Sequence, residues 1–116
     1  SLGFIGDERA IPKLNELLND NEPNIRWDSA VALAKMGVKT SIPIIENLMN
    51  RDYLMTFPEL DYKEIDKVIM TAIETSTLIV DSTFEPSLIE LAKNDQSLTV
   101  RDLAIKALKK SYDRTI

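Results

Sequence analysis

Apolar residues recur at helical spacing along this chain, and two stretches of the pattern repeat each other. Six positions of one stretch return 31 residues later, namely Leu2, Gly6, Ile11, Pro12, Leu17 and Leu18 as Leu33, Gly37, Ile42, Pro43, Leu48 and Met49. An offset of about thirty residues that keeps apolar positions, a glycine and a proline is typical of stacked two-helix units. The pattern therefore predicts an all-α solenoid that binds along an extended surface.

The first complete unit, about residues 7–37, is predicted to form two amphipathic helices joined by a polar turn. Asp7 is placed to cap the first helix. Pro12 lacks an amide hydrogen, so either the turn before it is loose or kinked or the regular helix begins near Ile11, and we expect a bend there. Gly37 is expected to end the second helix as a C-cap. The core positions predicted for the second helix are Ile25, Ser29, Ala30, Leu33 and Met36.

Two further units follow, so residues 1–116 are expected to form one solenoid domain of about three units. Second-helix residues of the first unit return 75 residues later in a last unit at about 83–112. The middle unit, at about 40–76, needs an offset of 40 for the same residues. The longer offset places an inserted turn at 50–64.

The start of the chain is predicted to be an apolar edge of the stack. Residues 2–6 align with the end of a second helix and are interpreted as the tail of a preceding unit. That edge would expose Leu2, Phe4 or Ile5 unless something docks on it. Either the chain is cut from a longer solenoid, or the edge is a native terminus that pairs with another chain and allows self-association.

Composition narrows the class of function. The chain has 116 residues, 44% of them hydrophobic and 28% charged, which indicates one globular domain. It shows neither a membrane-spanning run nor a signal peptide, so a cytoplasmic protein without a membrane partner is expected. The absence of cysteine and histidine removes thiol chemistry, the commonest general base and the commonest metal ligand. No catalytic residue, cofactor or metal is therefore expected.

A family resemblance lies in the first unit. The string Leu-Gly-Phe-Ile-Gly-Asp-Glu-Arg-Ala-Ile-Pro at 2–12, with the later pairs Ile25-Arg26, Ser29-Ala30 and Ala32-Leu33, resembles HEAT-like repeats of the phycobilisome-lyase type. The likeness covers residues 2–49 closely and 83–110 well, but the middle unit departs from it through its long turn and through Asp66, where the pattern has arginine. The resemblance implies a bacterial or archaeal HEAT-repeat protein with an α-α superhelix.

The same resemblance also implies a function. Second helices in this family line a concave face, and most members are binding scaffolds, so a non-catalytic scaffold for a protein or peptide is the function expected here. The alternative is a lyase-associated module, as in bilin lyases, with a chromophore or its carrier protein on the same face. Nucleic-acid binding is disfavoured by the net charge of −5.

Trp27 is the sharpest candidate for partner contact. Its equivalents in the other units are Lys67 and Asp102, which are polar, so Trp27 is predicted to face solvent on the second helix. The alternative is that it packs on an adjacent helix or beneath a preceding unit. The predicted partner-binding groove consists of Trp27, Val31, Lys35, Lys67, Thr71 and Lys106.

The inserted turn is unusually apolar, with Tyr53, Leu54, Met55 and Phe57 in close succession. These residues either fold back over the helices or form a docking loop in which Tyr53 and Phe57 contact the partner. The acidic residues that follow lack the glycine and the ligand spacing of a calcium loop. The cluster consists of Glu59, Asp61, Glu64 and Asp66, of which the last three are predicted to cap and solvate the start of the next helix.

Arginine recurs at the start of two second helices, as Arg26 and Arg101, and each follows an aspartate, Asp20 or Asp95. A helix N-terminus favours negative side chains, so an arginine there should have a carboxylate partner nearby. These four residues are therefore predicted to form braces between repeats. Anion binding by the arginines is the alternative.

Overall fold

The computed structural model describes residues 8–115, which are all-helical without a strand. The chain order is α1, α2, α3, α4, α5, α6 and α7, with a short 3-10 helix before α1 and another before α3. The bounds are η1 Glu8–Ala10, α1 Ile11–Leu17, α2 Pro23–Lys35, η2 Lys39–Ser41, α3 Ile42–Leu48, α4 Arg51–Leu54, α5 Tyr62–Ser76, α6 Phe84–Asn94 and α7 Leu98–Tyr112. This is an all-α helical repeat fold, as the sequence pattern predicted.

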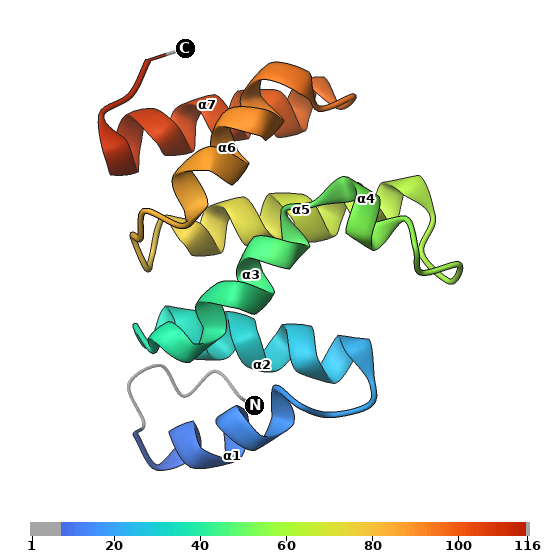
Figure 1. Ribbon diagram of the computed structural model, residues 1–116, viewed down its shortest axis with the longest axis vertical. Coiled ribbons are helices and arrows are strands. Elements are labelled where there is room, and N and C mark those ends of the chain that lie inside the picture. Colours follow the sequence, from blue (N-terminus) through green and yellow to red (C-terminus); the bar gives the residue numbers. More distant parts are fainter. Residues whose placement is uncertain (1–7, 116) are drawn as a thin grey trace.

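The helices stack in pairs along the longest axis. We call α1 and α2 unit one, α3 to α5 unit two, and α6 and α7 unit three; α1, α3 and α6 are the first helices, and α2, α5 and α7 the second helices. Figure 1 shows the second helices lying one above another, with α3 and α6 crossing obliquely between them. The second helices contact one another in sequence, α2 with α5 and α5 with α7.

Units one and two enter their first helices in the same way. In each, a 3-10 turn leads into an α-helix that carries a proline, Pro12 or Pro43, in its first turn. Proline fits there because the first helical amides have no partner within the helix. Of the two alternatives at Pro12, the structure shows the regular helix beginning at Ile11. Asp7 and the expected apolar edge at residues 2–6 lie outside the described residues.

Gly37 ends α2 as the sequence predicted. Its φ is +78°, in the left-handed region that a side chain disfavours. The amide of Val38 donates to the carbonyl of Leu33 at 2.9 Å, and the amide of Gly37 donates to that of Ala34 at 3.0 Å. This pair of bonds is a Schellman motif, which satisfies carbonyls left open at the helix end.

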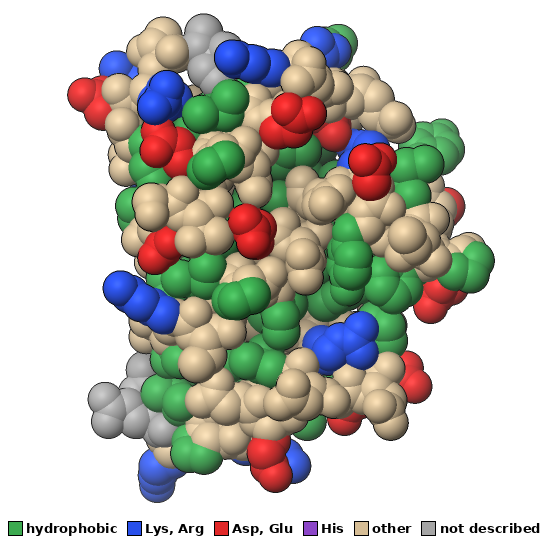
Figure 2. Space-filling model, in the orientation of Figure 1, with side chains coloured by type: hydrophobic (Ala, Val, Ile, Leu, Met, Phe, Trp, Pro, Cys, Tyr) green, Lys and Arg blue, Asp and Glu red, His purple; other side chains and the backbone are tan. Residues whose placement is uncertain are grey.

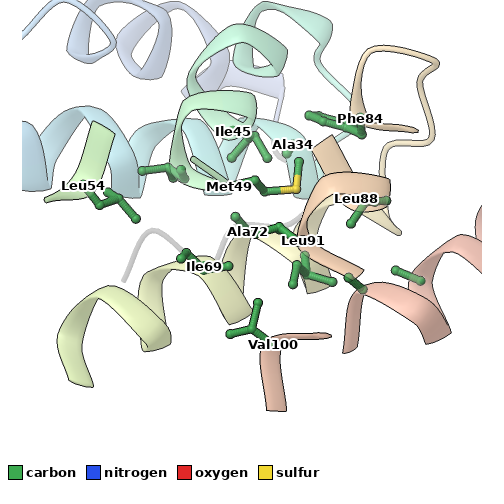
Figure 3. Close-up of a cluster of buried hydrophobic side chains, with 14 of the residues drawn as sticks. Ala34, Ile45, Met49, Leu54, Ile69, Ala72, Phe84, Leu88, Leu91 and Val100 are labelled. Atoms are coloured by element: carbon green, nitrogen blue, oxygen red, sulfur yellow. The ribbon is translucent and has the colours of Figure 1, made fainter. Parts of the chain in front are cut away.

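One apolar core runs through the three units. Figure 3 shows buried side chains from α2 to α7 gathered around α5, among them Ile45, Leu54, Ile69, Leu88 and Val100. Ser29, Ala30 and Leu33 of α2 are buried as predicted, and Met36 is half-buried. Burial of each large side chain contributes about 1.5–3 kcal/mol relative to exposure.

Ile25 corrects the predicted core. Its side chain is 38% exposed, whereas its equivalents Ile65 and Val100 are buried. The reason is position in the stack, because α5 and α7 each pack on the second helix of the unit before. No described residue provides such a helix for α2.

None of the helices within residues 8–115 combines the length and the apolar character that a membrane span needs.

Candidate interaction surfaces

Trp27 does not face solvent, so that expectation is wrong. Its side chain is 7% exposed, and its ring packs edge-to-face on Phe57, with ring centroids 5.2 Å apart and an interplanar angle of 89°. Tyr53 extends the cluster and lies 5.2 Å from Phe57 at 76°. The comparison between units failed because Phe57 packs on Trp27, whereas the equivalent side chains Lys67 and Asp102 are exposed.

The inserted segment folds back over the helices, which was one of its two predicted arrangements. Leu54 is fully buried, and Tyr53 and Phe57 are half-buried against the core. The Asn50 side chain caps α4 by accepting from the Tyr53 amide at 3.3 Å. Met55 is the exception, with 63% of its surface exposed. Figure 2 shows hydrophobic side chains along the edge that α4 and the following loop form.

The polar residues of the predicted groove lie at the surface of the second helices. Lys35, Lys67 and Thr71 are exposed, while Val31 is half-buried and packs on the core. Lys106 is exposed and pairs with Asp102 at 3.0 Å along α7. Neither Lys35 nor Lys67 forms an ion pair within the part of the chain that the structure describes. Of the predicted groove, the polar members are accessible and Trp27 is not.

Arg26 and Asp20 form a brace within one unit, not between two. The Arg26 Nη1 atom donates to the backbone carbonyls of Asp20 at 2.8 Å and Asn21 at 3.3 Å. The Asp20 carboxylate instead accepts from the Glu22 amide at 2.9 Å. The arginine therefore holds the turn that precedes α2, and the predicted inter-repeat role of this pair is wrong.

Arg51 makes the brace between repeats that the sequence reasoning assigned to Arg101. Its Nε and Nη2 atoms donate to the two carboxylate oxygens of Asp95, each at 2.9 Å, and Nη2 also donates to Asp66 at 2.6 Å. The side chains of Arg51 and Asp95 are only 11% and 3% exposed. The hydrogen bond with Asp95 raises the pKa of Arg51, against the opposing effect of burial.

Arg101 is left without its predicted partner. Its Nε atom is buried and has no hydrogen-bond partner among the described residues. Asp95, which was expected to pair with it, is held by Arg51 and also accepts from the Ser97 amide at 3.0 Å. The brace between units two and three is therefore formed by Arg51, and Arg101 takes no part in it.

The sequence contained a signal for this brace. Asp20 maps onto Arg51 at the offset of 31, and Arg26 maps onto Asp66 at the offset of 40. Unit two therefore carries the aspartate–arginine pair with its charges exchanged. The two offsets together predict the pair of Arg51 with Asp66. The contact of Arg51 with Asp95 depends on how the units stack and has no such signal in the sequence.

The acidic end of the insertion behaves largely as predicted. Asp61 caps α5 by accepting from the Glu64 amide at 2.8 Å, and the Glu64 side chain accepts from the Asp61 amide at 3.2 Å. This reciprocal pair is a capping box. Asp66 contacts Arg51 instead of the helix start. Residues 8–115 contain no group of three or more side chains arranged to hold a metal ion.

A cleft of about 740 Å³ opens between the end of α3, α4 and α6, on the first-helix side of units two and three. Its wall carries four carboxylates, Glu46, Asp52, Glu90 and Asp95, and one cation, Arg51. The sequence reasoning did not find it, because its two sides are far apart in the chain.

Comparison with known proteins bears on the first part of the chain. Residues 1–54 match the family model of HEAT repeats, which covers unit one and the first helix of unit two with α4. Neither the curated proteins nor the solved structures contain a match to this chain. HEAT repeats generally act as protein-interaction scaffolds and are typically non-catalytic. The repeat pattern, the paired helices and this match together support a HEAT-like repeat family.

Proposed function

We propose that this chain is a non-catalytic scaffold that binds a protein or peptide along the exposed side of α2, α5 and α7. The observation that carries the proposal is the set of lysines on adjacent second helices. Lys35 and Lys67 are exposed and have no ion pair within residues 8–115, and Lys106 lies on the next helix. A partner with carboxylates at matching positions would complement them.

The binding surface differs from the one predicted from sequence. Trp27 is covered by Phe57 and offers little area to a partner, so the proposed contacts are Lys35, Lys67, Thr71 and Lys106. Single exposed ion pairs contribute only about 0–1 kcal/mol. Affinity at this surface must therefore come from several contacts along the stack, which is how an extended repeat surface binds.

The alternative, a lyase-associated module that holds a chromophore of the phycobilisome type, ranks second. The family resemblance places a chromophore or its carrier protein on the second-helix face, and Trp27, the aromatic residue of the predicted groove, is buried against Phe57. A flat conjugated ligand would have to displace the insertion before it could stack on the indole. No other described residue favours this alternative.

The test is affinity capture with two matched charge-reversal variants. Lys35→Glu with Lys67→Glu changes the proposed face, and Lys13→Glu with Lys93→Glu makes the same charge change on α1 and α6, away from it. We expect a partner that the wild type and the α1/α6 variant retain and that the variant of the proposed face loses. Equal retention by all three proteins would exclude the second-helix face as the binding surface.

A further inference from the structure

The cleft between α3, α4 and α6 carries more negative than positive charge, because three of its four carboxylates have no ion pair within residues 8–115. Neither Glu46 nor Asp52 forms a hydrogen bond or an ion pair through its side chain within residues 8–115. Glu90 accepts only from Asn94, at 3.1 Å. Arg51, the one cation in the lining, forms ion pairs with Asp66 and Asp95. The cleft therefore attracts positive charge that the protein itself does not supply.

The rest of the lining suits a peptide better than a bare cation. Met49 and Leu91 are 3% and 5% exposed and give the cleft an apolar base. Asn47 and Gln96 are exposed at its wall and have no side-chain hydrogen bond within residues 8–115. Amide side chains both donate and accept, so they can pair with the N–H and C=O groups of an extended backbone. The amides of the cleft therefore suit the peptide backbone, its carboxylates suit basic side chains, and its apolar base suits their hydrocarbon parts.

We propose that this cleft binds an extended basic peptide segment, with its lysine or arginine side chains facing Glu46, Asp52 and Glu90. The carboxylates complement the charge of such a segment. The cleft is open to solvent on one side, and its volume of about 740 Å³ gives room for a short run of residues. The occupant lies on the first-helix side, so this site is separate from the second-helix surface proposed above.

The experiment measures binding of a short labelled peptide of alternating arginine and serine by fluorescence anisotropy. The test variant is Glu46→Gln with Glu90→Gln, in which neither residue forms an ion pair. The matched control is Glu59→Gln with Glu74→Gln, which makes the same charge change at exposed residues without an ion pair in the loop and on α5. We expect the Kd to rise about tenfold, equivalent to ~1.4 kcal/mol, in the test variant and to change little in the control.

Three outcomes would overturn the proposal. Absence of peptide binding by the wild-type protein would exclude the site. An equal rise in Kd in the test and control variants would show that binding depends only on net charge. Spermine has the positive charges without the peptide backbone, and we expect its affinity to be about tenfold lower. Equal affinity for spermine would contradict a peptide site. Lys35→Glu with Lys67→Glu should not weaken binding of the peptide to the cleft. A failure of the cleft proposal can therefore be told apart from a failure of the proposed second-helix surface.

Discussion

Beyond their shared apolar core, the two junctions between units differ in chemistry. Between units one and two the added contact is aromatic, because Phe57 packs edge-to-face on Trp27 of α2. Between units two and three it is ionic, because Arg51 donates two hydrogen bonds to Asp95 in the turn between α6 and α7. Phe57 and Arg51 both belong to segment 50–61, the part of the predicted inserted turn 50–64 that precedes α5.

This difference teaches what the insertion does. A repeat in a solenoid contacts only its neighbours, so the stability of the stack depends on each interface. The segment 50–61 extends from unit two in both directions and strengthens one interface with an aromatic pair and the other with a buried ion pair. The aromatic contact tolerates salt and pH changes, whereas the ionic contact depends on every partner being present.

The largest expected effect comes from breaking the ionic junction. Arg51→Met leaves Asp95, 3% exposed, and Asp66 without their cation. Loss of one partner from a buried pair costs about 3–5 kcal/mol, because the remaining charge is desolvated and unpaired. Urea unfolding would measure the change in free energy.

The matched control for this variant is an ion pair that is exposed. Lys106→Ala removes the contact to Asp102, whose side chain is 61% exposed, and should cost less than about 1 kcal/mol. A similar loss in both variants would contradict the claim that burial makes the Arg51 junction important.

The aromatic junction should show the next largest effect. Phe57 is half-buried, so Phe57→Ala should lose about 2 kcal/mol, less than the 3–5 kcal/mol typical of a fully buried phenylalanine. Because Trp27 is the single tryptophan, its fluorescence emission should also shift to the red as water reaches the indole. Fluorescence-detected urea unfolding measures both quantities at once.

Met55→Ala provides the control in the same loop. The side chain is 63% exposed, and a surface substitution is expected to change stability by less than about 0.5 kcal/mol. If Met55→Ala and Phe57→Ala gave the same emission shift, the contact between Phe57 and Trp27 would not be what covers the indole.

A smaller loss of stability is expected from a contact that lies outside both junctions. The Tyr112 hydroxyl donates to the Asp81 carbonyl at 2.6 Å, within unit three and its entry loop. Tyr112→Phe should cost about 1 kcal/mol, the usual net contribution of one hydrogen bond. Thermal unfolding at neutral pH would show it, with no change in Trp27 emission.

This contact also predicts a pH dependence with a definite sign. Burial raises the pKa of Tyr112 above its ordinary value, so the folded protein holds the phenolic proton more tightly than the unfolded chain does. Its contribution is therefore complete below the unfolded pKa of about 10 and is lost as the pH rises through the folded pKa. The stability difference between wild type and Tyr112→Phe should stay constant at neutral pH and shrink above that point. A difference that persists at higher pH would contradict the assignment.

The sequence predicted those features that the repeat period controls. The all-α stack follows from the offset of 31, and the Gly37 cap and the Asp61 cap follow from local chemistry that needs no tertiary information. These features depend on neighbouring residues in the chain, so their pattern is visible in one dimension.

The features that sequence reasoning missed depend on contacts across the stack. Trp27 was assigned to the surface from its polar equivalents, but the insertion of unit two covers it. Arg51 was overlooked because its partner Asp95 lies 44 residues away. Repeat comparison describes an average unit, and it fails where one unit differs from the others, which is where the candidate interaction surfaces lie.

Hydrogen-exchange mass spectrometry on Arg51→Met and Phe57→Ala tests the central claim that segment 50–61 holds both neighbouring units. Local opening free energies differ between elements of one fold, so each variant should loosen the unit that loses its contact. We predict faster amide exchange mainly in α6 and α7 for Arg51→Met and mainly in α1 and α2 for Phe57→Ala. The same pattern of exchange in both variants, or no change in either neighbour, would contradict the account.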